Sequence, residues 1–118
     1  MRTDAIEKFC LTLPGATLSI QWGADRVFKV GGKMFAAMGP KDARPQSLSF
    51  KTAPDSFAIL TEMAHIVPAP YLARAQWVQL TKLDALPAKA LKAYLARAHA
   101  IVAAGLPKKT RVALGLED

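Results

Sequence analysis

The side chains with the most evident chemical potential in this sequence are cationic. Sixteen Lys and Arg residues stand against nine Asp and Glu residues, which gives a net charge of +7. The surplus is uneven, because six basic residues and no acid lie between Asp84 and Glu117. Such a stretch favours polyanions such as nucleic acid or anionic lipid, and a solvated face that aids solubility is the alternative. If the polyanion is DNA, the residues expected to contact its phosphates are Lys29, Lys33, Lys51, Arg74, Lys82, Lys108, Lys109 and Arg111.

Three aromatic side chains suggest a second type of binding site. Trp22 precedes a glycine at the end of an expected strand, and Tyr71 lies in a proline-containing loop. In this alternative hypothesis, Trp22, Tyr71 and Trp77 line a groove that binds a protein or a small molecule, and the basic charge is incidental. The competing interpretation of Trp77 is ordinary packing, since Val78 and Leu80 follow it in an apolar strand.

No arrangement of residues in the sequence is typical of an enzyme or a metal site. The nine acids are scattered, without two carboxylates set side by side for acid–base catalysis. His65 and His99 lie thirty-four residues apart and Cys10 is the only cysteine, which matches no metal-ligand spacing. Gly31-Gly32-Lys33 is followed by Met34, where a phosphate-binding loop needs Ser or Thr. We therefore expect a protein that is not an enzyme and has no metal or cofactor.

Residues 4 to 13 are expected to form a short amphipathic helix. Ile6, Phe9, Cys10 and Leu13 are spaced so that they share one apolar stripe. The single cysteine is therefore interpreted as a small core residue and not as a nucleophile. Because one cysteine cannot form an intramolecular disulfide, nothing in the sequence requires an oxidising compartment.

Two further helices are expected in the second half of the chain. One covers residues 52 to 65, with Met63 on its inward stripe. The other covers residues 87 to 104 and stops at a glycine. His65 and His99 fall outside the apolar stripes, and we interpret both as surface or helix-end residues.

Several segments have the patterns of β-strands. The clearest is a hairpin around Gly31-Gly32, because glycine supplies the positive φ that a two-residue turn demands. In the expected register Phe28 lies opposite Phe35 on the core side, while Lys29 points to the other face. The expected strands are 17–21, 26–30, 33–38, 47–51 and 77–81, and the segments 39–46 and 66–75 are expected to be loops.

Composition and element order together predict one compact α+β domain covering residues 1–118. The apolar fraction of 52% and the charged fraction of 21% are ordinary for a globular protein. Strands flanked by helices favour a mostly antiparallel sheet with N-terminal, middle and C-terminal helices. The N-terminus lacks the apolar segment of a signal peptide, and the charge-free stretches are too short to span a membrane. We expect a cytoplasmic protein without a membrane partner.

Short motifs distributed over nearly the whole chain resemble those of the MmcQ/YjbR family. No single motif is diagnostic, but their order and spacing are specific. The motifs are Leu13-Pro-Gly-Ala-Thr17, Gln21-Trp-Gly23, Phe28-Lys-Val-Gly-Gly-Lys-Met-Phe35, Ser49-Phe-Lys-Thr52, Pro68-Ala-Pro-Tyr-Leu72, Trp77-Val-Gln-Leu80 and Leu106-Pro-Lys-Lys-Thr-Arg111.

The resemblance implies a CyaY-like (frataxin-like) fold, also described as a double wing, and a DNA-binding role. One form of the family carries a His-Met-Asn-like stretch before the Trp, where this chain has Tyr71-Leu-Ala-Arg-Ala-Gln-Trp77, so no role of that His or Asn is carried over. The frataxin likeness raises iron as a rival ligand. Iron would need clustered carboxylates, and the first helix offers only Asp4 and Glu7.

Overall fold

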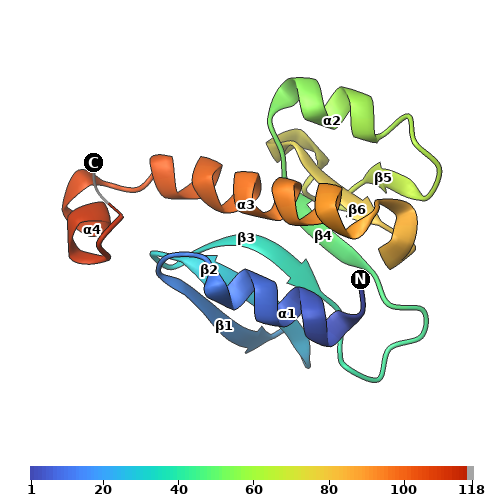
Figure 1. Ribbon diagram of the computed structural model, residues 1–118, viewed down its shortest axis with the longest axis horizontal. Helices are drawn as coiled ribbons and strands as arrows, with labels where there is room; N and C mark the ends of the chain where they lie inside the picture. Colours follow the sequence, from blue (N-terminus) through green and yellow to red (C-terminus); the bar gives the residue numbers. More distant parts are fainter. Residues whose placement is uncertain (117–118) are drawn as a thin grey trace.

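A six-stranded antiparallel sheet forms the centre of the structure, a computed structural model that describes residues 1–116 (Figure 1). Its strands are β1 (Ala16–Gln21), β2 (Asp25–Val30), β3 (Lys33–Met38), β4 (Leu48–Lys51), β5 (Ile66–Pro68) and β6 (Trp77–Leu80). The order across the sheet is β1-β2-β3-β4-β6-β5, and every neighbouring pair is antiparallel. The predicted α+β class is confirmed.

In residues 1–116, four α-helices and two short 3-10 turns surround the sheet. They are α1 (Thr3–Thr12), α2 (Pro54–Leu60), η1 (Ala73–Ala75), η2 (Leu83–Ala85), α3 (Ala88–Ala104) and α4 (Lys108–Ala113). α3 packs along β3 and β4, and α1 packs on β1 and on α3, so both cover one face of the sheet (Figure 1). α2 packs on β5 and β6. None of these helices is long and apolar enough to cross a lipid bilayer.

The hairpin between β2 and β3 turns at Gly31-Gly32 as predicted, but its register differs. The predicted pairing of Phe28 with Phe35 is wrong by one residue, because Phe28 pairs with Ala36. A bulge between the two strands adds one residue to β3, and both Phe35 and Ala36 are consequently fully buried. The rings of Phe28 and Phe35 remain neighbours, with centroids 6.5 Å apart.

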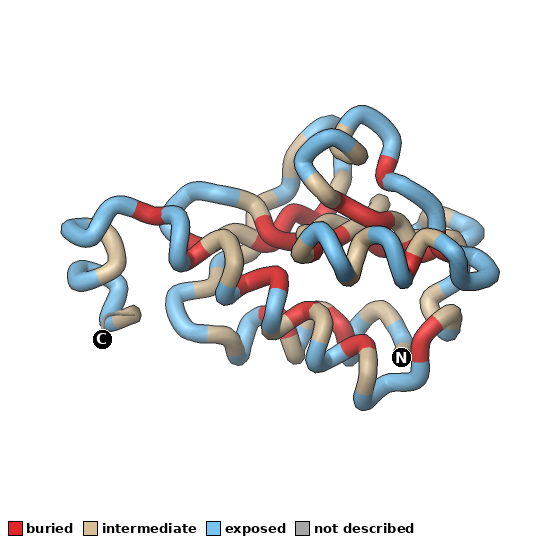
Figure 2. Tube along the Cα trace, turned by 90° about the horizontal axis from the view of Figure 1, so that it is seen from above, coloured by how far each residue is buried: buried red, intermediate tan, exposed pale blue. Residues whose placement is uncertain are grey.

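The hydrophobic core lies between the sheet and the two helices α1 and α3. Phe28, Phe35 and Phe50 of the sheet meet Leu95 of α3 there. Cys10 of α1 is fully buried in the same cluster, as predicted. Figure 2 shows the buried segments gathered in the middle of the molecule, whereas the region of α4 is mostly exposed. Each fully buried Leu or Phe side chain stabilises the fold by about 1.5–3 kcal/mol.

The chain after α2 departs from the prediction. α2 ends at Leu60, so the predicted helix as far as His65 is wrong, and Met63 is exposed instead of facing inward. The chain turns back at this point because the next residues pair with β6 as the edge strand β5. The segment 66–75 therefore begins with a strand and is not wholly a loop. The proline that ends β5 is tolerated, since an edge strand needs hydrogen bonds on one side only.

A buried arginine holds the loop between β3 and β4, which the sequence analysis did not anticipate. Arg26 of β2 is 2% exposed. Its Nε donates to the carbonyl oxygen of Gly39 at 3.0 Å, and its Nη2 donates to Oε1 of Gln46 at 2.9 Å. Its Nη1 also lies 3.8 Å from Oε1 of Glu7 in α1. The buried charge is thus paired and hydrogen-bonded, as burial of a cation requires.

His99 of α3 is also buried, so the prediction of a surface or helix-end position is wrong. The residue is 6% exposed, and its Nε2 lies 2.6 Å from the carbonyl oxygen of Pro14. The ring meets Phe35 edge-on, with centroids 5.3 Å apart. One hydrogen bond and one aromatic contact therefore offset the free-energy cost of burying this imidazole.

Candidate functional site

A pocket of about 430 Å³ opens at the end of the sheet where the β2–β3 hairpin turns. Its lining is largely apolar but includes two lysines, and we call it the lysine pocket. It is lined by Lys33, Met34, Lys51, Leu72, Ala75, Trp77, Ile101, Val102, Gly105 and Leu106. Two of the predicted phosphate contacts and one residue of the predicted aromatic groove therefore meet in one place.

The strand register explains why residues far apart in the sequence line this pocket. Lys51 at the end of β4 and Trp77 at the start of β6 are direct partners in the sheet. Lys33 is the first residue of β3 after the glycine turn. Ile101 and Val102, from the C-terminal part of α3, complete the lining. Each segment contributes one to four lining residues, so no contiguous motif encodes the pocket.

The loop that borders the lysine pocket, residues 71–76, is held in a strained conformation. Tyr71 and Gln76 have φ angles of 65° and 66°, in the left-handed region that residues other than glycine rarely adopt. Each such residue costs about 1–3 kcal/mol. Two hydrogen bonds offset this cost, because the carbonyl of Gln76 accepts from the backbone N–H of Thr52 at 2.8 Å and from its hydroxyl at 2.7 Å.

The positive charge of the lysine pocket is not neutralised by acidic side chains within residues 1–116. Lys51 donates from Nζ to the carbonyl oxygen of Ala75, which leaves the ammonium group two further donors. Lys33 is exposed. In this part of the chain the ion pairs involve only Arg2 and Arg26 among the basic residues. Both lysines can therefore attract an anion.

Two other predicted phosphate contacts lie next to residues of the lysine pocket. Lys29 pairs with Met34 in the β2–β3 ladder and is half-buried. Arg74 is exposed in η1, directly before Ala75. Two cations thus line the pocket, and the backbones of two more lie beside its lining residues.

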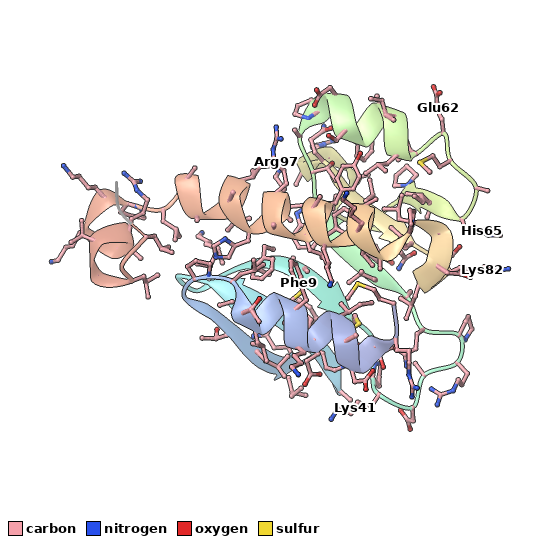
Figure 3. All side chains as sticks on the ribbon, viewed as in Figure 1. Phe9, Lys41, Glu62, His65, Lys82 and Arg97 are labelled. Carbon is pink, nitrogen blue, oxygen red and sulfur yellow. The ribbon has the colours of Figure 1, made fainter. Side chains whose placement is uncertain are left out.

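The remaining four predicted contacts are not part of this group. Lys82 follows the opposite end of β6, and Figure 3 shows it at the far side of the molecule from α4. Lys108 and Lys109 are exposed at the start of α4, a helix that the sequence analysis did not predict. Arg111 is half-buried and donates from Nη1 to the carbonyl oxygen of Leu106.

The three aromatic residues of the predicted groove do not come together. Trp77 is 4% exposed and lines the lysine pocket. Tyr71 is completely exposed, one residue before the lining residue Leu72. Trp22 is 66% exposed in the β1–β2 turn, at the opposite end of the sheet and on its far edge. Tyr71 and Trp77 thus share a location that Trp22 does not.

Arg97 of α3 belongs to the basic C-terminal stretch but was not among the predicted phosphate contacts. Arg97 lies four residues before Ile101, so both side chains start from the same face of the helix. It is exposed, and Figure 3 shows it projecting from the side of α3 that faces away from α1. Helical spacing would have pointed to Arg97 only if Ile101 had already been known to line a pocket.

Cys10, the only cysteine, lies in the core and does not line the lysine pocket. Burial, with a smaller effect of the Glu7 charge, raises the pKa of the Cys10 thiol to about 12, so it stays protonated at neutral pH. Within residues 1–116, no three His, Cys, Asp or Glu side chains gather in a way that could hold a metal ion. The arrangement of ammonium groups over an apolar wall suits an anion that carries an apolar or aromatic part.

Comparison with known proteins identifies the family to which the chain belongs. Residues 11–101 match the family described as YjbR. The structure is similar to the crystal structure of Deinococcus radiodurans protein DR2400, domain DUF419, with a TM-score of 0.83 and 30% sequence identity, over 98% of this chain and 88% of that chain. A search of curated proteins found no match. Because the family match extends over most of the chain, the protein belongs to the YjbR family that its motifs indicate.

Proposed function

We propose that the protein is a non-enzymatic DNA-binding protein that contacts phosphates through the four cations around the lysine pocket. The observation that carries this proposal is that cations without an acidic partner among residues 1–116 lie in and beside one pocket, next to a loop with an exposed aromatic ring. Lys33 and Lys51 line the pocket, while Arg74 and the wholly exposed Tyr71 lie on the strained loop beside it. Strained loop residues cluster at functional sites, where their cost is retained for a role other than stability.

The chemistry favours single-stranded over duplex DNA. Cationic side chains recognise the phosphate backbone without reading its sequence. An exposed tyrosine ring supplies a face on which an unpaired base stacks, worth about 1–3 kcal/mol per base. Tyr71 is such a ring, and a base in a duplex already has both faces stacked. The lysine pocket beside it accepts a neighbouring nucleotide against its apolar wall.

Salt dependence provides the test of this proposal. A fluorescently labelled single-stranded oligothymidine is titrated with the protein at increasing salt, with fluorescence anisotropy as the measurement. If about four phosphates are contacted, the logarithm of affinity falls against the logarithm of salt concentration with a slope near −2.8. The double variant Lys33→Gln/Lys51→Gln is expected to reduce the magnitude of this slope by about 1.4.

A matched control separates site-specific contacts from the overall charge. Lys82→Gln removes one exposed lysine at the opposite end of the sheet. We expect this variant to keep the wild-type slope and most of the affinity. Absence of binding at low salt, or equal losses for Lys82→Gln and for each pocket lysine, would contradict the proposal.

Binding of a small amphiphilic anion in the lysine pocket is the second candidate function. The volume of about 430 Å³ lies within the range of small-molecule sites, and buried Trp77 gives the pocket an aromatic wall. This candidate predicts that single nucleotides and oligonucleotides bind equally well. Affinity that grows with oligonucleotide length supports DNA binding instead.

A further inference from the structure

A second pocket lies on another side of α3 and belongs to no site described so far. Its volume is about 590 Å³. It is an open pocket lined by the C-terminal half of α3, by α4 with the residues that follow it, and by Pro14 in the turn between α1 and β1. Ala100, Ala103 and Ala104 form the helical wall. Their small side chains leave the space open, and we call it the α3–α4 pocket.

The hydrogen bond of His99 defines what this residue offers to the α3–α4 pocket. The carbonyl oxygen of Pro14 can only accept a hydrogen bond, so Nε2 of His99 carries the hydrogen. In the neutral ring Nδ1 is then an acceptor. Within residues 1–116 every fully buried side-chain nitrogen or oxygen has a hydrogen-bond partner. Because Nδ1 has none among these residues and His99 lines the pocket, this nitrogen opens into it.

Arg111 supplies a positive charge whose position is fixed by the fold. Its Nη1 donates to the carbonyl oxygen of Leu106, and four further N–H donors of the guanidinium remain. Leu114, which follows α4, lies close to the turn after α1, because a Cβ atom added at Gly15 would be 3.6 Å from its Cβ. No acidic side chain is among the pocket residues in the described part of the chain.

We propose that the α3–α4 pocket binds a small organic carboxylate. The planar guanidinium of Arg111 matches the two oxygens of a carboxylate and pairs with them through parallel N–H donors. The alanine wall receives the apolar body of the ligand. Nδ1 of His99 accepts a hydrogen bond from a donor elsewhere on the ligand. This site is independent of the proposed DNA-binding function and lies on different residues.

Benzoate is the probe for this proposal, with benzamide and inorganic phosphate as comparisons. Benzamide has the same shape without the charge, and phosphate has the charge without an apolar body. In a ¹H–¹⁵N NMR titration of the whole protein, benzoate is expected to give saturable shifts at residues 99–104 and in α4. Both comparison ligands are expected to bind about tenfold more weakly or not at all. Equal binding of either one would overturn the proposal.

Filling the pocket tests the location of the site without removing a polar group. Ala100→Leu places a larger side chain in the α3–α4 pocket at an exposed helical position, where leucine is well tolerated. It is expected to weaken benzoate binding about tenfold or more. Ala93→Leu, an exposed position of the same helix outside both pockets, is the control and should bind as the wild type does. Unchanged binding by Ala100→Leu, or no saturable shift in the wild type, contradicts the proposal.

Discussion

Tyr71 combines an unfavourable backbone with a completely exposed ring, so at this residue stability and binding are expected to oppose each other. Asparagine tolerates the left-handed region better than tyrosine does. We expect Tyr71→Asn to raise the free energy of unfolding by about 0.5–1 kcal/mol and to weaken single-stranded DNA binding by about 1–3 kcal/mol, because the stacking face is lost. Urea unfolding and fluorescence anisotropy measure the two effects.

The aromatic control for this prediction is Tyr71→Phe, which keeps the ring and removes the hydroxyl. It is expected to leave both the stability and the DNA affinity close to the wild-type values. Retained DNA affinity in Tyr71→Asn would show that the ring has no part in binding. A lower free energy of unfolding in Tyr71→Asn would instead show that the tyrosine ring stabilises the fold by packing on its neighbours.

Cys10 links stability to alkaline pH, because burial raises its pKa from 9.0 to about 12. The unfolded thiol ionises near its ordinary pKa, whereas the folded protein keeps the proton. The resulting stabilisation is fully present below about pH 9 and is lost as the pH rises from there towards 12, by about 1.4 kcal/mol per pH unit. Urea unfolding of the wild type and of Cys10→Ala at about pH 8, 9 and 10 measures the difference. Parallel pH dependence of the two proteins would contradict the prediction.

At the scale of elements, Gly31 in the turn of the β2–β3 hairpin lies directly against Leu106, just after the end of α3. A Cβ atom at Gly31 would lie 2.6 Å from Cδ1 of Leu106, and the φ angle of 59° also disfavours a side chain. At Gly32 the φ angle is 80°, but nothing lies within 4 Å of such a Cβ. Both Gly→Ala variants lose about 1 kcal/mol of stability from the backbone. We expect Gly31→Ala to lose a further 1–2 kcal/mol, roughly, from crowding.

Chemical denaturation of the two glycine variants measures this difference. Adding Leu106→Ala to Gly31→Ala removes the crowded side chain, so the double variant should cost less than the sum of the single ones. Equal destabilisation by Gly31→Ala and Gly32→Ala would mean that Leu106, although 4% exposed, moves aside without cost.

The elements with local signals could be predicted from the sequence, and those that depend on distant partners could not. The Gly-Gly pair predicts the hairpin turn, and the helical spacing of apolar residues predicts α3. In contrast, β5 forms because β6 is present to pair with it. The same dependence on distant partners explains why the site was predicted only in part. Lys51 and Trp77 meet through strand pairing, and the burial of Arg26 and His99 depends on contacts with Glu7 and Pro14 that no spacing encodes.

At the scale of the whole molecule, the C-terminal half of α3 separates the two pockets. Ile101 and Val102 line the lysine pocket, while Ala100 and Ala103 line the α3–α4 pocket. Adjacent positions on a helix point in directions about 100° apart, so the two pockets lie on different sides of the same helix. Ala103 is 9% exposed, so this part of the helix is packed against its neighbours.

Two pockets on one packed helix are expected to bind their ligands independently. A saturating concentration of benzoate should change the affinity for single-stranded oligothymidine less than about twofold near 0.15 M salt, where the Debye length of about 8 Å screens repulsion between the bound anions. Ala100→Leu should likewise keep the DNA affinity, and Lys33→Gln/Lys51→Gln should keep the benzoate affinity. Anisotropy titrations with and without benzoate, and NMR titrations of the double variant, measure both directions. Mutual weakening that persists at higher salt would mean that α3 moves when either ligand binds, since electrostatic repulsion alone fades as salt is added.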